Sequence, residues 1–424
     1  MPQRSSRRRK KKKAVPILTS IYAKNFGPIY DARIPVRNFT IIMGPNNSGK
    51  TFLATLALFA QNILELMEFL ERFRQKTTIP KRLLNKSIQE SIKRRLCELY
   101  TVEEPSELIN AQANEAKIGF TFRLGKEVLE FKASVIKNNV IAEIPKIGTQ
   151  FYVPRWNIVY IPAERAGIMR TYRQLLRLHL ETRWPHPLKE EFLKKYEALG
   201  GKLISPPGLV KIFLDEILSI GTFTPSETSS AQKYALEMLQ KAIGGKLFMR
   251  EDLSIMYEEQ IPKVQIPLER SSSSVSEVAS IYLMTKFLSK NSLLVVEEPE
   301  SHLHPRGQMM IARYFARLVR KNARVLITTH SDLLALKAAQ LVGLSGISEE
   351  ERIKLNYDKD EYLKSNELSI CFLEPMERGS VSKQIKVSPT GEVEDLPTYS
   401  TVVEEMYGEA VKLLELHRKI SKLS

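Results

Sequence analysis

The stretch FTIIMGPNNSGKTFLATLALF, at residues 39–59, decides the fold of this 424-residue chain. Its central eight residues, GPNNSGKT at 44–51, match the pattern GxxxxGK followed by Ser or Thr at every position. An apolar run precedes this loop and apolar residues at near-helical spacing follow it, which predicts the order strand, glycine loop, helix. In that order, backbone N–H groups of the loop and of the helix N-terminus surround phosphate oxygens. The sequence therefore predicts a nucleotide-binding P-loop.

The positions that define this motif have separate physical roles. Gly44 and Gly49 allow the chain to wrap tightly around a phosphate group. The ammonium group of Lys50 is expected to reach the β- and γ-phosphates of a nucleotide, and the hydroxyl of Thr51 is expected to coordinate Mg²⁺. The whole loop is the predicted nucleotide-binding site: Gly44, Pro45, Asn46, Asn47, Ser48, Gly49, Lys50 and Thr51.

Two acidic residues follow an apolar strand in SLLVVEEPESHLHP, residues 292–305. Four apolar residues bury this strand and place Glu297 and Glu298 at its C-terminal end, where ligands bind in open α/β sheets. We assign Glu297 to the metal site beside Thr51. We assign Glu298 to positioning or deprotonating the attacking water.

A histidine ends another apolar strand, in ARVLITTHSD at residues 323–332. His330 stands at a strand end equivalent to that of the two acids, from which an imidazole can donate a hydrogen bond to the γ-phosphate. A lone histidine at a strand end is often structural, and the two neighbouring motifs favour the functional interpretation. The predicted catalytic residues are thus Glu298, Lys50 and His330.

The remaining pattern predicts an α/β fold. Residues 17–43 alternate as three short strands, and residues 117–145 return to strand alternation. Unalternating apolar strands at 292–298 and 323–329, joined by a helix starting near Pro305, predict a buried parallel sheet. Three further expectations are edge strands at 247–268, a serine-rich loop that leads into a helix capped by Ser276 or a neighbour, and a final hairpin followed by a helix whose apolar face carries Val403, Tyr407, Ala410 and Leu414.

The length of the chain exceeds what one hydrophobic core usually serves, which predicts either two domains or one large domain with an insertion. We expect an N-terminal antiparallel β-subdomain in the first part of an ATPase head and a helical insertion before its second part. The predicted boundaries are 1–14 for a basic tail, 15–165 for the N-terminal part of the head, 166–245 for the helical lobe and 246–424 for the C-terminal part.

The net charge of +16 is concentrated at the N-terminus. Half of the excess lies within residues 1–13, where arginine and lysine stand without any acid. Such a block favours a polyanion as partner, or else serves as a solubilising or sorting tail. Arg170, Arg173 and Arg177 fall on one predicted helix face, which could follow a phosphate backbone or simply be solvated.

Composition also predicts the compartment. Cys97 and Cys371 are the two cysteines, and their separation favours neither a disulfide framework nor a zinc cluster. We find no apolar run of membrane-spanning length and no apolar h-region behind the basic N-terminus. These features predict a soluble, cytoplasmic protein without a membrane partner.

Six short segments of the chain occur in an order that resembles the ABC-type AAA ATPases of the RecF, SMC and OLD group. The segments are NFGPI, GPNNSGKT, YIPAERAG, SSSSVSE, VVEEPESHLHP and ITTHSD, and together they cover residues 17–335 discontinuously. The resemblance implies an ABC-ATPase-like, two-lobed P-loop head that binds ATP with Mg²⁺. It also implies a head-to-tail homodimer that closes two nucleotides at its interface.

The resemblance also implies roles for residues outside the P-loop. In this family a serine-rich signature loop caps the γ-phosphate of the opposite subunit, and Ser272, Ser273 and Ser274 occupy its place. A glycine is usual near Ser274, and aspartate is commoner than glutamate at the position of Glu297. His330 matches the switch histidine of the family.

Three further segments match parts of the family pattern. Residues 300–305 match the loop that crosses between the two active sites. Asn25, Phe26 and Gly27 fall where the first hairpin of the family approaches the base and ribose. Arg165, at the end of YIPAER, could touch phosphate, couple closure to the helical lobe or form a structural salt bridge.

The sequence thus predicts an ATPase in which ATP closes a dimer and hydrolysis reopens it. The basic tail favours nucleic acid as the molecule on which the ATPase acts, as in DNA repair or antiviral defence. The first alternative is a regulatory ATPase that gates a separate effector, such as a nuclease, without binding nucleic acid itself. The second is the energy module of a membrane transporter, which the absent LSGGQ sequence disfavours.

Overall fold

The computed structural model describes most of the chain. The described residues are 14–74, 81–145, 151–154, 157–171, 208–219, 230–250, 254–394, 396 and 405–414. The basic block at residues 1–13 lies outside them, as do Arg173, Arg177, Val403 and much of the expected helical lobe.

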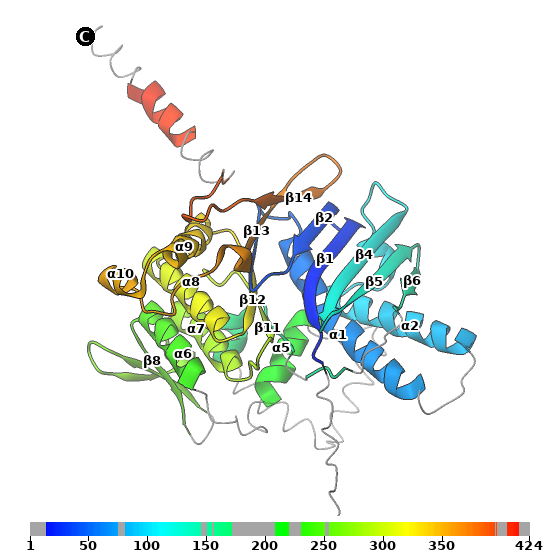
Figure 1. The fold of residues 1–424 in the computed structure, drawn as a ribbon, viewed down its shortest axis with the longest axis horizontal. Helices are drawn as coiled ribbons and strands as arrows, with labels where there is room; N and C mark the ends of the chain where they lie inside the picture. The colour runs from blue at the N-terminus through cyan, green and yellow to red at the C-terminus, as the bar shows by residue number, and fades with distance from the viewer. Residues whose placement is uncertain are drawn as a thin grey trace, which may run out of the picture.

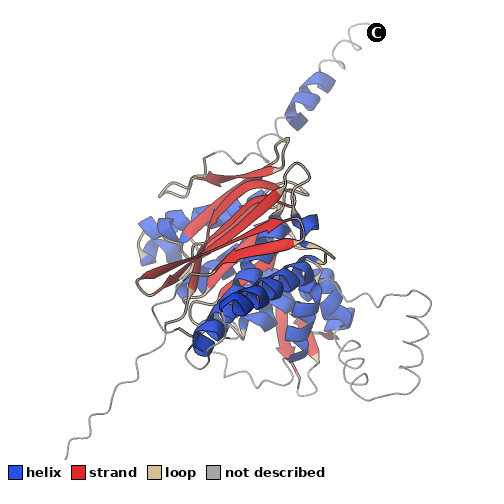
Figure 2. Cartoon of the chain, turned by 90° about the vertical axis from the view of Figure 1, so that its right-hand side faces the viewer, coloured by secondary structure: helices blue, strands red, loops and turns tan. Residues whose placement is uncertain are grey.

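The described strands build one large mixed sheet of eleven strands, in the order β6-β5-β4-β1-β2-β14-β13-β3-β12-β11-β7. Helices lie on both faces of this sheet (Figures 1 and 2). The α/β class predicted from the sequence is confirmed. The strands are β1 Ile17–Phe26, β2 Ile29–Pro35, β3 Phe39–Met43, β4 Glu115–Leu124, β5 Glu127–Ile136, β6 Asn139–Glu143, β7 Ile158–Ile161, β11 Leu293–Glu297, β12 Arg324–Thr329, β13 Leu368–Glu374 and β14 Ser380–Ile385.

One end of the sheet is parallel and the other is antiparallel. Strands β7, β11, β12, β3 and β13 pair in parallel, and β3, β11 and β12 are buried along their whole length, as the unalternating apolar sequence predicted. Strands β2, β1, β4, β5 and β6 pair antiparallel and form the expected N-terminal subdomain. The hairpin β13–β14 joins the two ends, because β14 also pairs with β2.

The order of the parallel strands decides where the active site forms. Strand β12 lies between β3, which precedes the P-loop, and β11, which ends in the two acids. Since parallel strands end at one edge of a sheet, the P-loop, Glu297 and His330 come to the same edge.

The two faces of the sheet support separate hydrophobic cores. Alternate residues of the parallel strands face α1 and α2 on one side and α6 to α9 on the other. Figure 1 shows these two helical groups on either side of the strands. The helices are α1 Lys50–Arg74, α2 Lys81–Tyr100, α5 Gly208–Ser219, α6 Ser230–Ile243, α7 Ser273–Thr285, α8 Pro305–Arg320, α9 Asp332–Gly343 and α10 Glu349–Lys354.

Two expectations about the second half of the chain need correction. Residues 247–268 do not form edge strands of the main sheet, because β8 Gly245–Met249, β9 Ile255–Glu259 and β10 Gln265–Pro267 pair with one another as a separate sheet. Helix α7 begins earlier than expected, since Ser272 is its N-cap and accepts a hydrogen bond from the backbone of Val275. Ser276 is fully buried within the helix instead of capping it.

Helix α1 corrects the expectation that no apolar run reaches membrane-spanning length. Its segment Lys50–Arg72 is long and apolar enough to cross a bilayer by length and composition. In this structure 78% of the apolar window is buried, against the sheet and α2. The same length and composition therefore describe the core helix of this α/β fold.

The expected helical lobe is only partly described. Residues 166–171, 208–219 and 230–243 are helical. The parts before and after this segment share one sheet, as expected for a head interrupted by an insertion. At the C-terminal end, residues 405–414 are helical, and the apolar side chains of Met406, Tyr407, Leu413 and Leu414 are exposed.

Candidate active site

The P-loop has the backbone that its glycines were expected to provide. Gly44, Asn47 and Gly49 have φ angles of 153°, 60° and 96°. A Cβ atom on Gly44 would lie 2.9 Å from the carbonyl oxygen of Leu373, and one on Gly49 would lie 2.7 Å from Ile29 Cγ1. No larger side chain fits at either glycine without moving its neighbours.

The side chain of Lys50, at the start of α1, points back toward the beginning of the P-loop. Its Nζ donates hydrogen bonds to the carbonyl oxygens of Gly44, at 2.9 Å, and Pro45, at 2.8 Å. Burial lowers the pKa of Lys50, and the nearby carboxylates of Glu298, Glu300 and Glu297 oppose that shift. The ammonium group is thus a buried point charge beside the loop backbone, as phosphate binding requires.

The two predicted metal ligands meet across β12. The Thr51 hydroxyl donates to Glu297 Oε2 at 2.5 Å, and the Tyr160 hydroxyl donates to Glu297 Oε1. Burial raises the pKa of Glu297 to about 7, and the Thr51 hydrogen bond and Lys50 oppose that rise. A carboxylate so far from water gains from a neighbouring cation.

The chemistry of these groups fits a nucleotide with Mg²⁺. The Oγ atom of Ser48 is buried and has no hydrogen-bond partner, so a phosphate oxygen would satisfy it. Thr51 and Glu297 would hold the metal ion. The described residues contain no group of three or more His, Cys, Asp or Glu side chains suited to a metal. Phosphate oxygens and water would complete the coordination of Mg²⁺. The metal would neutralise charge on the phosphates.

The predicted base lies beside the predicted switch residue. Glu298 Oε1 is 3.6 Å from His330 Nε2, and both side chains are partly exposed. The backbone of Glu298 has a φ of 41°, an unusual value for a residue with a side chain. The structure thus brings together Lys50, Glu297, Glu298 and His330 at one sheet edge, as the sequence predicted.

Glu300 fixes the end of β12. Its Oε1 accepts hydrogen bonds from Thr329 Oγ1, at 2.6 Å, and from the backbone N–H of His330, at 2.7 Å. Burial raises the pKa of Glu300, and these two hydrogen bonds oppose the rise. The first residue of the predicted crossing loop therefore orients the histidine.

The signature serines lie at the N-terminus of α7. Ser272 caps the helix, Ser273 begins it, and Ser274 Oγ donates to the carbonyl oxygen of His302 at 2.6 Å. Within the described part of the chain, no hydrogen bond joins these serines to the P-loop. Arg170 donates to the carbonyl oxygen of Ser271, at 2.7 Å, so this arginine supports the serine segment and does not simply face solvent.

The side chain of Phe26 points into the core, which corrects the expectation that it approaches the base and ribose. Phe26 is fully buried and packs edge-on against Phe52 and Tyr100. The side chain of Asn25 donates to the carbonyl oxygen of Glu115 at 3.3 Å. Both residues therefore shape the hairpin beside the P-loop, and Phe26 cannot stack on a ligand.

Arg165 is a buried structural link and has no exposed surface for phosphate. It donates to the backbone carbonyl oxygens of Glu297 and Glu298, and its Nε lies 2.6 Å from Glu277 Oε2 on α7. Burial raises the pKa of Glu277 to about 7, although Arg165 opposes the rise. Of the three roles open from the sequence, contact with phosphate does not fit this burial.

Sequence reasoning missed Tyr160 and Glu277. Tyr160 is the one residue of β7 with a polar tip in an otherwise apolar strand, and that contrast was an available signal. Glu277 was equally visible as an acid in the apolar stretch VSEVASIYL.

Replacing Tyr160 by Phe is expected to raise the Mg²⁺ concentration needed for half-maximal ATP hydrolysis by about 10-fold to 100-fold. The ring keeps its packing, but Glu297 loses the donor that orients one of its oxygens. The measurement is ATPase rate against Mg²⁺ concentration. Tyr314→Phe is the matched control, because Tyr314 is also fully buried and its hydroxyl bonds to Thr285 instead. Identical Mg²⁺ dependence in both variants would contradict this role.

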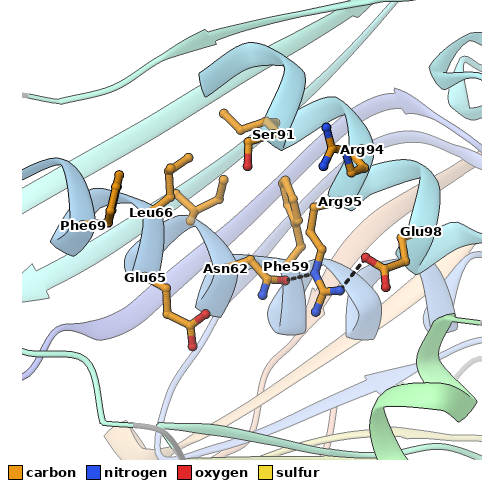
Figure 3. Close-up of a pocket in the computed structure, with 11 residues that line it drawn as sticks. Phe59, Asn62, Glu65, Leu66, Phe69, Ser91, Arg94, Arg95 and Glu98 are labelled. Carbon is orange, nitrogen blue, oxygen red and sulfur yellow. Dashed lines mark hydrogen bonds and ion pairs between the residues drawn. The ribbon is translucent and has the colours of Figure 1, made fainter. Parts of the chain in front are cut away.

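A separate groove lies between α1 and α2 (Figure 3). Its volume is about 350 Å³, and Arg95 bonds there to Asn62 and Glu98. Its lining includes Phe59, Leu66 and Phe69 but no P-loop residue. The active site described above is therefore a different surface.

Comparison with known proteins identifies the family. The family model of the AAA ATPase domain matches residues 17–158 and 171–335. A search among curated proteins finds no match. Among solved structures, the SMC head domain from Thermotoga maritima is similar at 12% identity, covering 88% of this chain and 100% of its own, with a TM-score of 0.43. A Pyrococcus furiosus Smc head bound to the C-terminal domain of ScpA is similar at 16% identity, covering 92% and 100%, with a TM-score of 0.43.

The family match spans both halves of the large sheet and includes the P-loop, both acids and His330. These are the parts that the geometry brings to one edge. The chain belongs to the AAA ATPase domain family, which confirms the predicted class of ATPase.

Proposed function

We propose that ATP closes two copies of this chain head to tail and that hydrolysis lets them separate. One observation carries the proposal: the hydrogen bond from Thr51 to Glu297 joins the P-loop to the strand end that also bears Glu298. Nucleotide, metal ligands and base therefore share one edge of the sheet. In this arrangement Glu298 positions or deprotonates water, and Lys50 stabilises charge on the phosphates.

The signature segment supports the dimer. Ser273 and Ser274 stand at the N-terminus of a 13-residue helix, where backbone N–H groups and the helix dipole favour an anion. Because these serines make no hydrogen bond to the P-loop among the described residues, a nucleotide held by a second copy is their proposed ligand.

We propose that the ATPase acts on nucleic acid, in DNA repair or antiviral defence in the cytoplasm. The support is the charge of the chain, since half of its excess of +16 lies in residues 1–13. On the outer face of the antiparallel strands, Lys117 pairs with Glu115 and Lys132 pairs with Glu130, so these two lysines are largely neutralised. The basic tail is therefore the proposed contact with phosphates.

The test is retention of the protein on duplex DNA with ATP present, at rising salt. We expect the full chain to bind with steep salt dependence, and we expect removal of residues 1–13 to flatten it, because fewer counterions are released. A variant with neutral glutamines in place of the eight basic residues controls for tail length. If retention on DNA does not change with salt for any of these forms, nucleic acid is not the partner and the proposal is contradicted.

The second candidate is an ATPase that gates a separate effector protein. It is favoured by the exposed apolar side chains of the helix at 405–414, where Tyr407 is 72% exposed and Met406 is 65% exposed. Exposed apolar groups of this size favour a protein surface as partner. Absence of DNA retention together with capture of a defined effector by the full chain, and loss of capture by Tyr407→Ser, would favour this candidate.

A further inference from the structure

Arg165 occupies the point where β7, β11 and α7 meet. Its side chain is fully buried, although a guanidinium group is among the most costly groups to remove from water. Nη1 donates to the carbonyl oxygens of Pro162, at 2.9 Å, and Glu297, at 2.6 Å, and Nη2 donates to that of Glu298, at 2.8 Å. The planar fork thus binds the main chain of both acids at once.

This contact holds the predicted base in an unusual conformation. Glu298 has a φ of 41°, and such backbone persists only where the surroundings fix it. Arg165 fixes it on the carbonyl side, and the backbone N–H of Glu298 donates to the carbonyl oxygen of Thr328 on the other side, at 2.9 Å. The direction of the Glu298 side chain therefore depends on Arg165.

The remaining nitrogen of Arg165 connects this strand end to the signature helix. Nε lies 2.6 Å from Oε2 of Glu277, which is 2% exposed and lies one turn after Ser273 on α7. The other oxygen of Glu277 lies 4.0 Å from His302 Nε2, and Ser274 donates to the carbonyl oxygen of His302. The signature serines and the base are thus joined by one continuous set of contacts, which is buried from Glu277 through Arg165, exposed at His302 and partly exposed at Ser274.

We propose that Arg165 and Glu277 form a positioning pair. When the signature serines of one chain bind the nucleotide held by its partner, this pair transmits the contact to Glu298 of the chain that carries the serines and orients it. The inference rests on the proposed ATP-dependent dimer. Among the described residues, neither side chain makes a hydrogen bond or ion pair with the P-loop. Each acts through Glu298, so that hydrolysis in one site follows engagement of α7 in the other.

The first test is Arg165→Lys in the full-length protein. Lysine keeps the charge but cannot bind three carbonyl oxygens and a carboxylate at once. We expect kcat to fall by about 10²-fold, as a misplaced catalytic group does, while KM for ATP stays within about twofold because the P-loop is untouched. The control is Arg317→Lys, which changes another fully buried arginine whose partners are Asp358 and Glu361. We expect that variant to retain its kcat below its unfolding temperature.

The second test is a double-mutant cycle with Ser274→Ala. If the pair couples the serines to the base, Arg165→Lys combined with Ser274→Ala lowers kcat no further than Arg165→Lys alone. If the kcat of the double variant falls by the product of the two single reductions, the inference is overturned. Glu277→Gln, which keeps the shape but not the charge, provides the same cycle in case Arg165→Lys does not fold.

The outcomes separate this inference from the function on which it rests. If Arg165→Lys has normal kcat and Glu298→Gln is inactive, the positioning role of Arg165 and Glu277 is contradicted. The proposed ATP-dependent dimer is then unaffected. Parent turnover in Glu298→Gln overturns the switch itself. An equal fall of kcat in Arg165→Lys and Arg317→Lys assigns Arg165 a purely structural role, and so also overturns the pair.

Discussion

Glu298→Gln is expected to lower kcat for ATP hydrolysis by about 10²-fold to 10⁴-fold, the usual contribution of a positioned general base. The amide keeps the size of the side chain and its place beside His330, 3.6 Å away, but it cannot accept a proton from water. Nucleotide binding is expected to remain, because the P-loop is unchanged. The measurement is steady-state ATPase rate together with the fraction of ATP that stays bound and unhydrolysed.

Glu374→Gln is the matched control for this variant. Glu374 ends β13, a parallel strand that lies beside β3 on the side opposite β12, and its side chain is exposed. It therefore shares the sheet edge without the contact to His330. We expect parent turnover from this control. Parent turnover from Glu298→Gln as well would show that the base is a different group.

Lys50→Met is expected to weaken ATP binding by about 10²-fold, since a charge-assisted hydrogen bond to phosphate contributes about 1.5–3 kcal/mol. The same substitution is expected to leave the free energy of unfolding without nucleotide unchanged or higher. Burial lowers the pKa of Lys50, so the charge is costly there, and an apolar chain of similar volume removes that cost. Nucleotide titration and denaturant unfolding measure the two effects.

The two readouts separate a phosphate contact from a purely structural one. Among the residues that the structure describes, Lys50 donates to the carbonyl oxygens of its own loop, which by itself would fit a structural role. Loss of stability with normal ATP affinity would support that role and contradict ours. Lys126→Met, at the exposed turn between β4 and β5, should change neither quantity.

The parts of the site that depend on local order could be predicted from the sequence. A strand, a glycine loop and a helix are contiguous in residues 39–74, so their geometry follows from neighbouring residues. Glu297 and His330 each follow an apolar strand, and parallel strands end at one edge whatever their order. This is why the predicted residues meet, although 246 positions separate Thr51 from Glu297.

The remaining features depend on backbone detail that periodicity does not carry. Ile21 and Ala23 face the core, so strict alternation along β1 would turn Phe26 outward. The positive φ of Asn25, 51°, reverses the next side chain and buries Phe26. The N-cap of α7 was ambiguous for a different reason, because four consecutive serines can each cap a helix.

The contacts of Tyr160 and Arg165 could not be predicted from the sequence because they depend on strand order. Both reach β11 only because β7 pairs with it at the end of the sheet. The partner of Arg165 on α7 lies 112 residues further along the chain, and no spacing rule connects the two. Buried polar residues inside apolar segments were visible, but their partners were not.

The central claim is that ATP holds two copies of this chain together, and its most direct test is the mass of Glu298→Gln in solution. We predict a monomer without nucleotide or with ADP, and a stable dimer once ATP and Mg²⁺ are added. Sedimentation or light scattering distinguishes these states, and Lys50→Met in the same background should stay monomeric. A Glu298→Gln protein that binds ATP and remains monomeric at every concentration tested would contradict the account.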